Sequence, residues 1–379
     1  MRSGPVYRRA AWGSVKVKTG RSTRICLVPR LAGVGGMVSF QYKLMDGLRA
    51  RGVQVCQDLA DTPYQAVLVI GGTRNLAGLW RARRQGIPVA QRLDGMNWLH
   101  RLAGIRKDGW RHYLRAEYGN RLLALIRSRL ASRIVYQSEF ARGWWERTHG
   151  QSAQPWRVIY NGVDLTSYSP EGNRPPGDRW RLLLVEGSLM GGYEQGLQAA
   201  VELSLRLAQL LAAPAAPIER RTVELAVAGR VNAGVQNEWE TRLQQKRGGL
   251  PVSINWAGLT PLEQIPALDR SAHLLYSSDI HPACPNAVIE ALACGLPVIA
   301  FETGALPEMV NGEAGRIVPY GGEAWKLEPP DVDGLAQAAM SVLADQERYR
   351  NGARRRAEAI FGLDQMVEQY LSVLLEGQG

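Results

Sequence analysis

Residues 272–318, AHLLYSSDIHPACPNAVIEALACGLPVIAFETGALPEMVNGEAGRIV, carry the clearest pattern of strands and helices in this chain. An apolar strand at 274–276 is followed by a loop and by a short helix that begins near Pro285. A second apolar strand comes next, at 297–301. This order of strand, helix and strand predicts a parallel crossover unit of an α/β sheet. Ligands of such sheets bind beyond the carboxyl ends of the strands.

The start of the predicted helix has the features of a phosphate site. Pro285 suits the first turn, where its missing N–H costs nothing. The amides of Asn286 and Ala287 would be among the unpaired donors of that turn, and such donors bind phosphate. Glu290 lies one turn further along on much the same face, where its carboxylate can accept hydrogen bonds from sugar hydroxyls. The pairing suits a nucleotide diphosphate and its ribose.

The same stretch resembles the signature of the retaining glycosyltransferases of family 4. Residues 290–298, EALACGLPV, match the second half of the family motif. Residues 302–308, ETGALPE, match its downstream turn, where Gly304 gives close backbone approach and Ala305 replaces a second glycine. The resemblance covers residues 24–375. It implies the α/β GT-B fold, with two Rossmann-like, doubly wound domains facing a central cleft.

The resemblance also implies an activity. A retaining hexosyltransferase would move a sugar from a UDP- or GDP-sugar to a glycan or lipid-linked acceptor in polysaccharide or glycoconjugate synthesis. Enzymes of this type are thought to need no protein nucleophile, because the leaving phosphate itself takes the acceptor proton. No metal and no cofactor beyond the nucleotide-sugar substrate are expected.

Two departures from the family pattern leave a second hypothesis open. The first carboxylate of the family pair falls on Pro282, and Asp279 or His281 could substitute from the same loop. The basic pair expected against the diphosphate is missing from residues 184–194, so Arg230, after the next apolar strand, is the candidate. The alternative is a non-catalytic GT-B relative that binds nucleotide sugar or glycan within an assembly. An epimerase on the same fold is less favoured, since it needs cleft acids and histidines, and the chain has 5 histidines.

The first domain opens with a buried-strand pattern at 24–28, a glycine loop, and a helix at 37–51. These glycines do not have the G-x-G-x-x-G spacing, and no acid ends the second strand, so a nicotinamide enzyme is disfavoured. In the resembled family this loop faces the cleft. Gly35 and Gly36 would let the backbone approach donor phosphate or acceptor.

Asp94 follows the strand predicted at 88–93, at the edge of the sheet where ligands gather. Its carboxylate could accept a hydrogen bond from an acceptor hydroxyl. The other interpretation, a turn former or helix cap before Gly95, stays equally open. His100 is expected at the surface. The catalytic candidates are therefore Asp94, Glu290 and His281.

The chain is long enough for two domains. Residues 167–180 are rich in Pro, Gly and Ser and predict a linker. The predicted parts are a disordered basic leader at 1–23, an acceptor-side domain at 24–166, a nucleotide-sugar domain at 180–360, and a helix at 361–379 that crosses back to the first domain.

Composition and charge limit the classes of partner that this chain can bind. Of the 379 residues, 45% are hydrophobic and 21% charged, as in a globular protein. Neither a membrane-spanning apolar run nor a secretory signal is visible, which predicts a cytoplasmic protein. The net charge is +11, with basic zones before Ile25 and at 101–133. This charge predicts an anionic partner, either a membrane surface at its inner face or a lipid-pyrophosphate acceptor. A solvated tail and helix face is the open alternative.

Nucleic acid is disfavoured as a partner, because no recognised binding module accompanies the charge. The 4 cysteines have neither Cys-x-x-Cys nor zinc spacing, so reduced thiols are expected.

Overall fold

The computed structural model describes residues 23–33, 35–102, 109–189, 194–214 and 216–376. The predicted basic leader lies outside the described residues, apart from Thr23. Two compact units divide the chain. Unit 1 holds the chain up to Gly162 and from Leu363 onward, and unit 2 is Val163–Gly362.

Unit 1 is built on a parallel sheet of six strands in the order β2-β1-β3-β4-β5-β6. The strands are β1 Arg24–Val28, β2 Gln54–Cys56, β3 Ala66–Ile70, β4 Val89–Leu93, β5 Arg133–Tyr136 and β6 Trp156–Val158. The helices are α1 Gly36–Ala50, α2 Leu76–Arg84, η1 Leu99–Arg101, α3 Gly109–Leu125, η3 Ile126–Leu130, α4 Glu139–His149 and α12 Leu363–Leu375.

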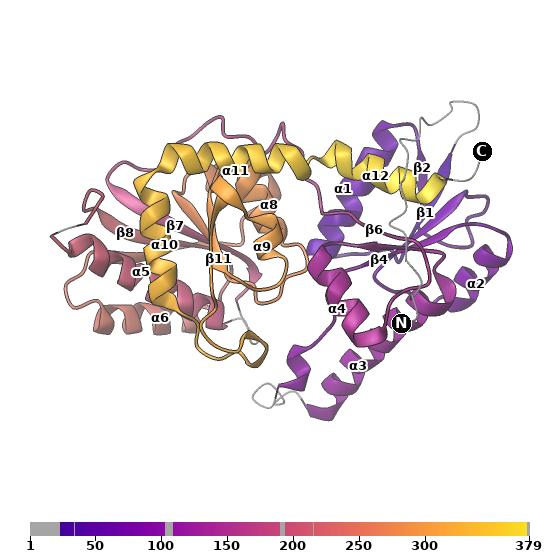
Figure 1. The fold of residues 1–379 in the computed structure, drawn as a ribbon, viewed down its shortest axis with the longest axis horizontal. Coiled ribbons are helices and arrows are strands. Elements are labelled where there is room, and N and C mark those ends of the chain that lie inside the picture. The colour runs from indigo at the N-terminus through magenta and orange to yellow at the C-terminus, as the bar shows by residue number, and fades with distance from the viewer. Residues whose placement is uncertain (1–22, 34, 103–108, 190–193, 215, 377–379) are drawn as a thin grey trace, which may run out of the picture. The chain divides into compact units, whose positions relative to one another are not determined.

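Helices cover both faces of this sheet (Figure 1). α1 and α12 share one core with the strands, and the rings of Phe40 and Tyr370 lie 5.2 Å apart within it. The opposite face carries a second core, to which α2 contributes Leu79. Because both faces are covered, every residue of the two central strands, β3 and β4, is buried.

Unit 2 has a second parallel sheet of six strands, in the order β12-β11-β10-β7-β8-β9. The strands are β7 Arg179–Ser188, β8 Thr222–Arg230, β9 Val252–Gly258, β10 Leu274–Ser277, β11 Val298–Phe301 and β12 Gly315–Val318. The helices are α5 Glu194–Ala212, α6 Ala233–Lys246, η4 Leu262–Gln264, α7 Ile265–Arg270, α8 Asn286–Ala293, α9 Leu306–Met309, η5 Gly312–Ala314, η6 Ala324–Lys326, α10 Val332–Ala344 and α11 Gln346–Ile360.

The strand order of unit 2 reverses direction at its centre. From β7 the chain moves outward to β8 and β9, then returns to place β10 on the other side of β7. In an open α/β sheet this switch point opens a crevice at the carboxyl ends of the two central strands. The two parallel sheets with their helices confirm the predicted doubly wound α/β fold.

The segment before β7 packs on unit 2. Arg270 donates to the Ser169 carbonyl over 3.1 Å and to the Asn173 side chain over 3.2 Å. The amide of Val163 donates to the carbonyl of Phe361 over 2.9 Å. Both crossings between the units therefore lie together in unit 2, at Val163 and at Gly362. None of the helices in the described ranges is long and apolar enough to span a membrane.

Candidate functional site

Two acidic side chains meet at the switch point of unit 2. Glu186 lies near the end of β7, and Asp279 follows β10. The Ser278 hydroxyl joins the two strand ends by donating to Glu186 Oε1 over 2.6 Å. The backbones of β7 and β8 also lie close together here, because a Cβ on Gly229 would lie 2.1 Å from the Glu186 carbonyl oxygen. The crevice is thus lined by carboxyl groups where the family pattern has a basic pair.

Burial governs the charge of this pair. Desolvation raises the pKa of Glu186, and the nearby Asp279 carboxylate raises it further, while the Ser278 hydroxyl opposes the shift. Burial also raises the pKa of Asp279. Two carboxylates that share a buried site cannot both ionise at little cost, so the pair holds a proton near neutral pH. A protonated pair repels a phosphate less than two carboxylates would.

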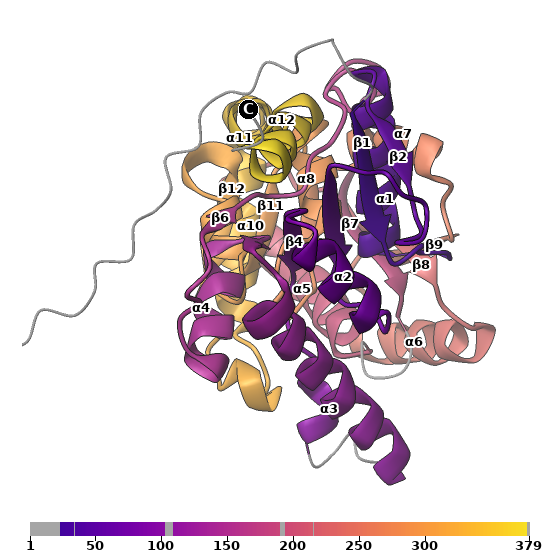
Figure 2. The same ribbon diagram turned by 90° about the vertical axis from the view of Figure 1, so that its right-hand side faces the viewer.

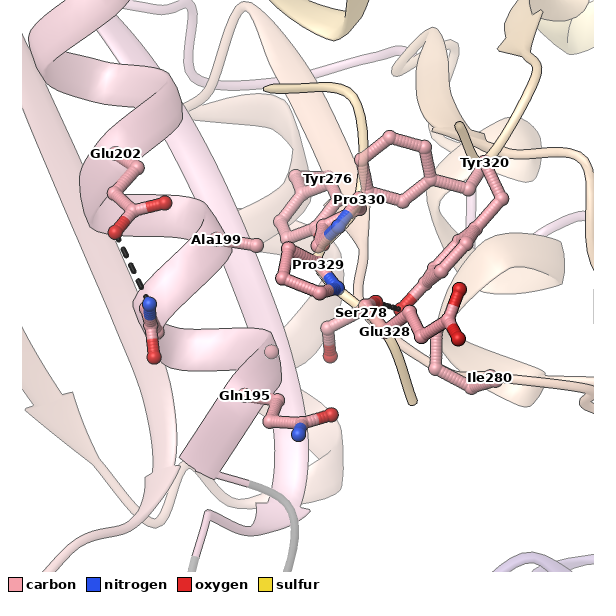
Figure 3. A pocket seen from close by; sticks show the side chains of 13 residues that line it. Gln195, Ala199, Glu202, Tyr276, Ser278, Ile280, Tyr320, Glu328, Pro329 and Pro330 are labelled. Atoms are coloured by element: carbon pink, nitrogen blue, oxygen red, sulfur yellow. Dashed lines mark hydrogen bonds between the residues drawn. The ribbon is translucent and has the colours of Figure 1, made fainter. Parts of the chain in front are cut away.

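A cavity with aromatic walls, of about 130 Å³, adjoins the same strand ends (Figure 3). Tyr276, Tyr320 and the two prolines Pro329 and Pro330 form its apolar side, and α5 forms the other. The start of α5 comes very close to β10, since a Cβ on Gly196 would lie 2.7 Å from the Ser278 Cβ. The first turn of α5 is therefore fitted to the strand end that carries Ser278.

The start of α8 has no side-chain cap. Pro285 occupies the N-cap position, and Asn286 and Ala287 are half-buried. By contrast, α6 is capped by Asn232 and α10 by Asp331, each accepting from a backbone amide. An uncapped helix start beside the carboxyl end of β10 has the geometry in which amides face an anion.

Glu290 lies on α8 and is buried. Its charge raises the pKa of the Tyr168 phenol and of the Asp269 carboxyl, to whose shifts burial contributes most. These effects show that Glu290 lies near Tyr168 and near α7.

The loop after β10 and the loop after β11 are locked together. The Ala305 amide donates to the Pro282 carbonyl over 2.8 Å. Gly304 has φ +59°, and a Cβ there would lie 2.5 Å from the Pro282 ring. The structure brings His281, Gly304 and Ala305 together, but the Ala305 amide is engaged within the protein.

His281 has a left-handed backbone, with φ +55°. Its ring stacks on Trp325 of η6, with centroids 3.7 Å apart. Burial lowers the pKa of His281 to about 4, so the ring is neutral near pH 7.

Arg230 is the last residue of β8 and is exposed. Its carbonyl accepts from the Leu189 amide over 3.1 Å, so its backbone lies at the same sheet edge as the end of β7.

The remaining candidates belong to unit 1. Asp94 directly follows β4. Burial raises its pKa above the usual value, although the charge of Arg92 opposes the shift. Gly35 caps α1 with φ +146°, and both it and Gly36 are exposed. The prediction for His100 is wrong. Its ring is buried, with Nε2 2.9 Å from a carboxylate oxygen of Glu117.

Sequence reasoning missed Glu186 and Ser278. Glu186 follows the apolar run at 182–185, and Ser278 follows the one at 274–276. Placing β7 and β10 side by side in a doubly wound sheet would have paired these strand ends, so the signal was present. Within the described parts of the chain, no three acidic, histidine or cysteine side chains form a group suited to a metal. The absence of a metal requirement stays a prediction.

Comparisons with known proteins fit this geometry. Residues 197–345 match the family described as Glycosyl transferases group 1. Over 133 residues the chain is 26% identical to the GDP-mannose-dependent alpha-(1-6)-phosphatidylinositol dimannoside mannosyltransferase of Mycobacterium tuberculosis, covering 35% of this chain and 32% of that protein. Sucrose-phosphate synthase from Thermosynechococcus elongatus matches with a TM-score of 0.67 at 18% identity, over 92% of this chain and 97% of that chain. HepE from Anabaena, solved in complex with UDP and glucose, has a TM-score of 0.61 at 16% identity, over 93% and 99%.

These structural likenesses define the class, since both sheets and their helices match the GT-B fold of glycosyltransferases. Within that class, residues 197–345 form a Glycosyl transferases group 1 domain, which confirms the resemblance drawn from the motifs. The chain spans about a third of the length of the curated mannosyltransferase that it matches.

Proposed function

We propose that this chain is a retaining hexosyltransferase that uses a UDP- or GDP-sugar as donor. The acceptor is a glycan or a lipid-linked sugar in polysaccharide or glycoconjugate synthesis. The observation that carries the proposal is the uncapped start of α8 beside the switch point of unit 2, within the group 1 domain. The relatives support the donor class, because one is named for GDP-mannose and HepE was solved with UDP.

In this proposal unit 2 stabilises the leaving diphosphate. The amides of Asn286 and Ala287 and the guanidinium of Arg230 face the charge that develops as the glycosidic bond breaks. Fixed dipoles and charges of this kind stabilise a transition state without reorganising water. The shared proton of the Glu186–Asp279 pair reduces the negative charge in the same crevice. Glu290 holds the nucleotide sugar, and His281, neutral near pH 7, offers an uncharged imidazole to it.

Unit 1 supplies the acceptor side. Asp94 accepts a hydrogen bond from the acceptor hydroxyl, while the leaving phosphate takes its proton. Gly35 and Gly36 leave the start of α1 open to backbone approach. An anionic membrane surface is a further partner. The expected cytoplasmic location and peripheral membrane contact stay predictions.

Donor turnover tests the proposal. Purified chain is incubated with UDP- and GDP-sugars, and release of UDP or GDP is followed with and without glycan acceptors. The Glu290→Gln variant should lower kcat/KM at least about tenfold, because one hydrogen-bonding carboxylate is lost. Glu347→Gln, an exposed change on α11, is the matched control and should leave turnover unchanged.

One observation favours a second candidate, a non-catalytic binder of nucleotide sugar. Pro282 occupies the place of the family's first carboxylate, and Glu186 lies where basic residues are expected. Binding of UDP or GDP without transfer or hydrolysis of any donor would support this candidate and overturn the enzyme.

A further inference from the structure

Helix α3 of unit 1 presents its apolar side to solvent. Trp110, Leu114, Tyr118 and Leu125 are 68%, 53%, 55% and 44% exposed. An α-helix turns 100° per residue, so these four side chains and Arg121 share an arc of about 80°. We call this set of five residues the α3 stripe. In an ordinary surface helix such an arc faces the core, whereas here it faces outward.

Leu122 packs α3 on the core of unit 1 and Asn120 binds the Asn97 backbone, whereas the α3 stripe stays exposed. Asn120 is its one buried residue, and the helix extends beyond the sheet in both views (Figures 1 and 2). Most helices in proteins are stabilised by packing an apolar face on the rest of the fold, and the α3 stripe makes no such contribution. The stripe thus has the chemistry of a surface that another apolar phase covers.

The charge around the stripe is positive. Arg111 and Arg115 lie beside it and are exposed, and Arg121 lies within it. These three arginines form no ion pair with any residue in the described ranges. The one acid of the helix, Glu117, is paired with Arg101 and hydrogen-bonded to His100, and these contacts lower its pKa to about 2.

A cavity of about 410 Å³ lies against the same helix. Its lining consists of Arg101, Tyr113, Leu114, Glu117, Tyr118 and Arg121. Two phenols and the Arg121 guanidinium line this cavity, and the Glu117 carboxylate in the lining is paired with Arg101. A guanidinium and phenol hydroxyls suit the phosphate of a lipid headgroup, and Leu114 suits its acyl chains.

We propose that the α3 stripe is a membrane-docking surface that enters the interface of an anionic phospholipid bilayer. Indole and phenol rings favour the level of the headgroups, and the flanking arginines bind lipid phosphates. A second copy of the chain fits less well, because two stripes face to face would bring like charges together. The inference rests on α3 alone and does not depend on sugar transfer.

Vesicle binding by the full chain tests this. Phosphatidylcholine vesicles with and without phosphatidylglycerol are compared by flotation at low salt. The triple variant Trp110→Gln, Leu114→Gln, Tyr118→Gln should lower partitioning onto the anionic vesicles by roughly tenfold or more. Neutralising Arg111, Arg115 and Arg121 should lower it about fivefold per charge and flatten its dependence on salt.

Trp80 provides the matched control. It is 52% exposed on α2 and stacks with Arg84, outside the α3 stripe. Trp80→Gln should bind vesicles as the unchanged chain does. Brominated lipid should quench part of the tryptophan fluorescence, and Trp110→Phe should remove that part while Trp80→Phe should not.

Three outcomes would overturn the proposal. The unchanged chain fails to bind anionic vesicles, or the triple variant binds them equally well, or the variant abolishes self-association without any vesicle binding. Unchanged thermal unfolding of the triple variant shows that α3 is still folded. Donor hydrolysis in solution should persist in this variant, so failure of membrane docking and failure of the enzyme proposal are distinguishable.

Discussion

At the scale of single residues, the site is defined by which charges are buried. Glu186 and Asp279 occupy the crevice where a basic pair was expected, and burial keeps the pair protonated near neutral pH. With one shared proton the pair carries one negative charge rather than two, and the amides at the start of α8 are the groups that would attract a diphosphate. Arg230, at the end of the neighbouring strand β8, adds a positive charge at the same edge of the sheet.

The Glu186 carboxyl predicts a dependence of stability on pH. Its folded pKa lies above its unfolded value, so the folded chain binds more protons between the two values, from about 4.5 to about 8. Stability should therefore fall as pH rises through that window. Glu186→Gln, which can still accept from Ser278, should remove part of this fall and raise the free energy of unfolding at pH 8 by at least about 1 kcal/mol.

Urea unfolding at a series of pH values measures this effect. Glu347→Gln, exposed on α11, is the control and should leave the slope unchanged. A slope in Glu186→Gln equal to that of the unchanged chain would show that the carboxyl is ionised in the folded state.

His273 and His281 act in the opposite direction. Burial is the main cause that lowers each pKa to about 4, so the unfolded chain binds more protons between pH 4 and 6.5. Stability should fall as pH drops through that range. His273→Gln should weaken the fall, if the side-chain oxygen keeps the hydrogen bond from the Arg181 amide. Acid unfolding followed by circular dichroism tests this, and an unchanged midpoint would contradict it.

At the scale of elements, two loops of unit 2 contain a glycine in a left-handed conformation. Gly304 and Gly312 share φ +59°, a left-handed conformation that disfavours a side chain. They differ in space, because a Cβ on Gly304 meets Pro282 at 2.5 Å and one on Gly312 meets nothing within 4 Å. Alanine substitutions at these two glycines therefore distinguish the cost of backbone strain, which both share, from that of a steric clash, which only Gly304 has.

Gly312→Ala should cost about 1 kcal/mol of unfolding free energy, from the backbone strain alone. Gly304→Ala should cost about 1–3 kcal/mol more, because the loop that carries His281 must move. It should also weaken UDP or GDP binding, which Gly312→Ala should leave intact. Equal losses of stability in urea would show that the loops after β10 and β11 are not held together.

At the scale of the whole molecule, net charge steers association. The chain carries a formal charge of +11, and residues 1–20 contribute basic side chains and no acid. A positive field raises the rate and strength of binding to anionic surfaces at low salt.

Deleting residues 1–20 should lower binding to phosphatidylglycerol vesicles at low salt, and the difference should vanish at high salt. The loss should add to that of the α3 variants, since the two regions are separate in sequence. Flotation of the four combinations measures it. Unchanged binding after deletion would make the leader irrelevant to membranes.

Local patterns in the sequence were enough to predict several elements and the glycosyltransferase domain at residues 197–345. Periodicity and glycine punctuation are local, so the strands at 24–28 and 88–93 and the helix at 37–51 were predicted at or within a residue of their observed ends. The motif at 290–308 also pointed correctly to a glycosyltransferase domain.

Which distant residues meet became clear from the three-dimensional fold. Glu186 and Ser278 are 92 positions apart. They become partners because the strand order reverses after β9 and places β10 beside β7. The burial of His100 and the outward face of α3 were equally hidden. Strand order and exposure depend on long-range packing, and a local pattern of apolar residues does not say which surface will cover it.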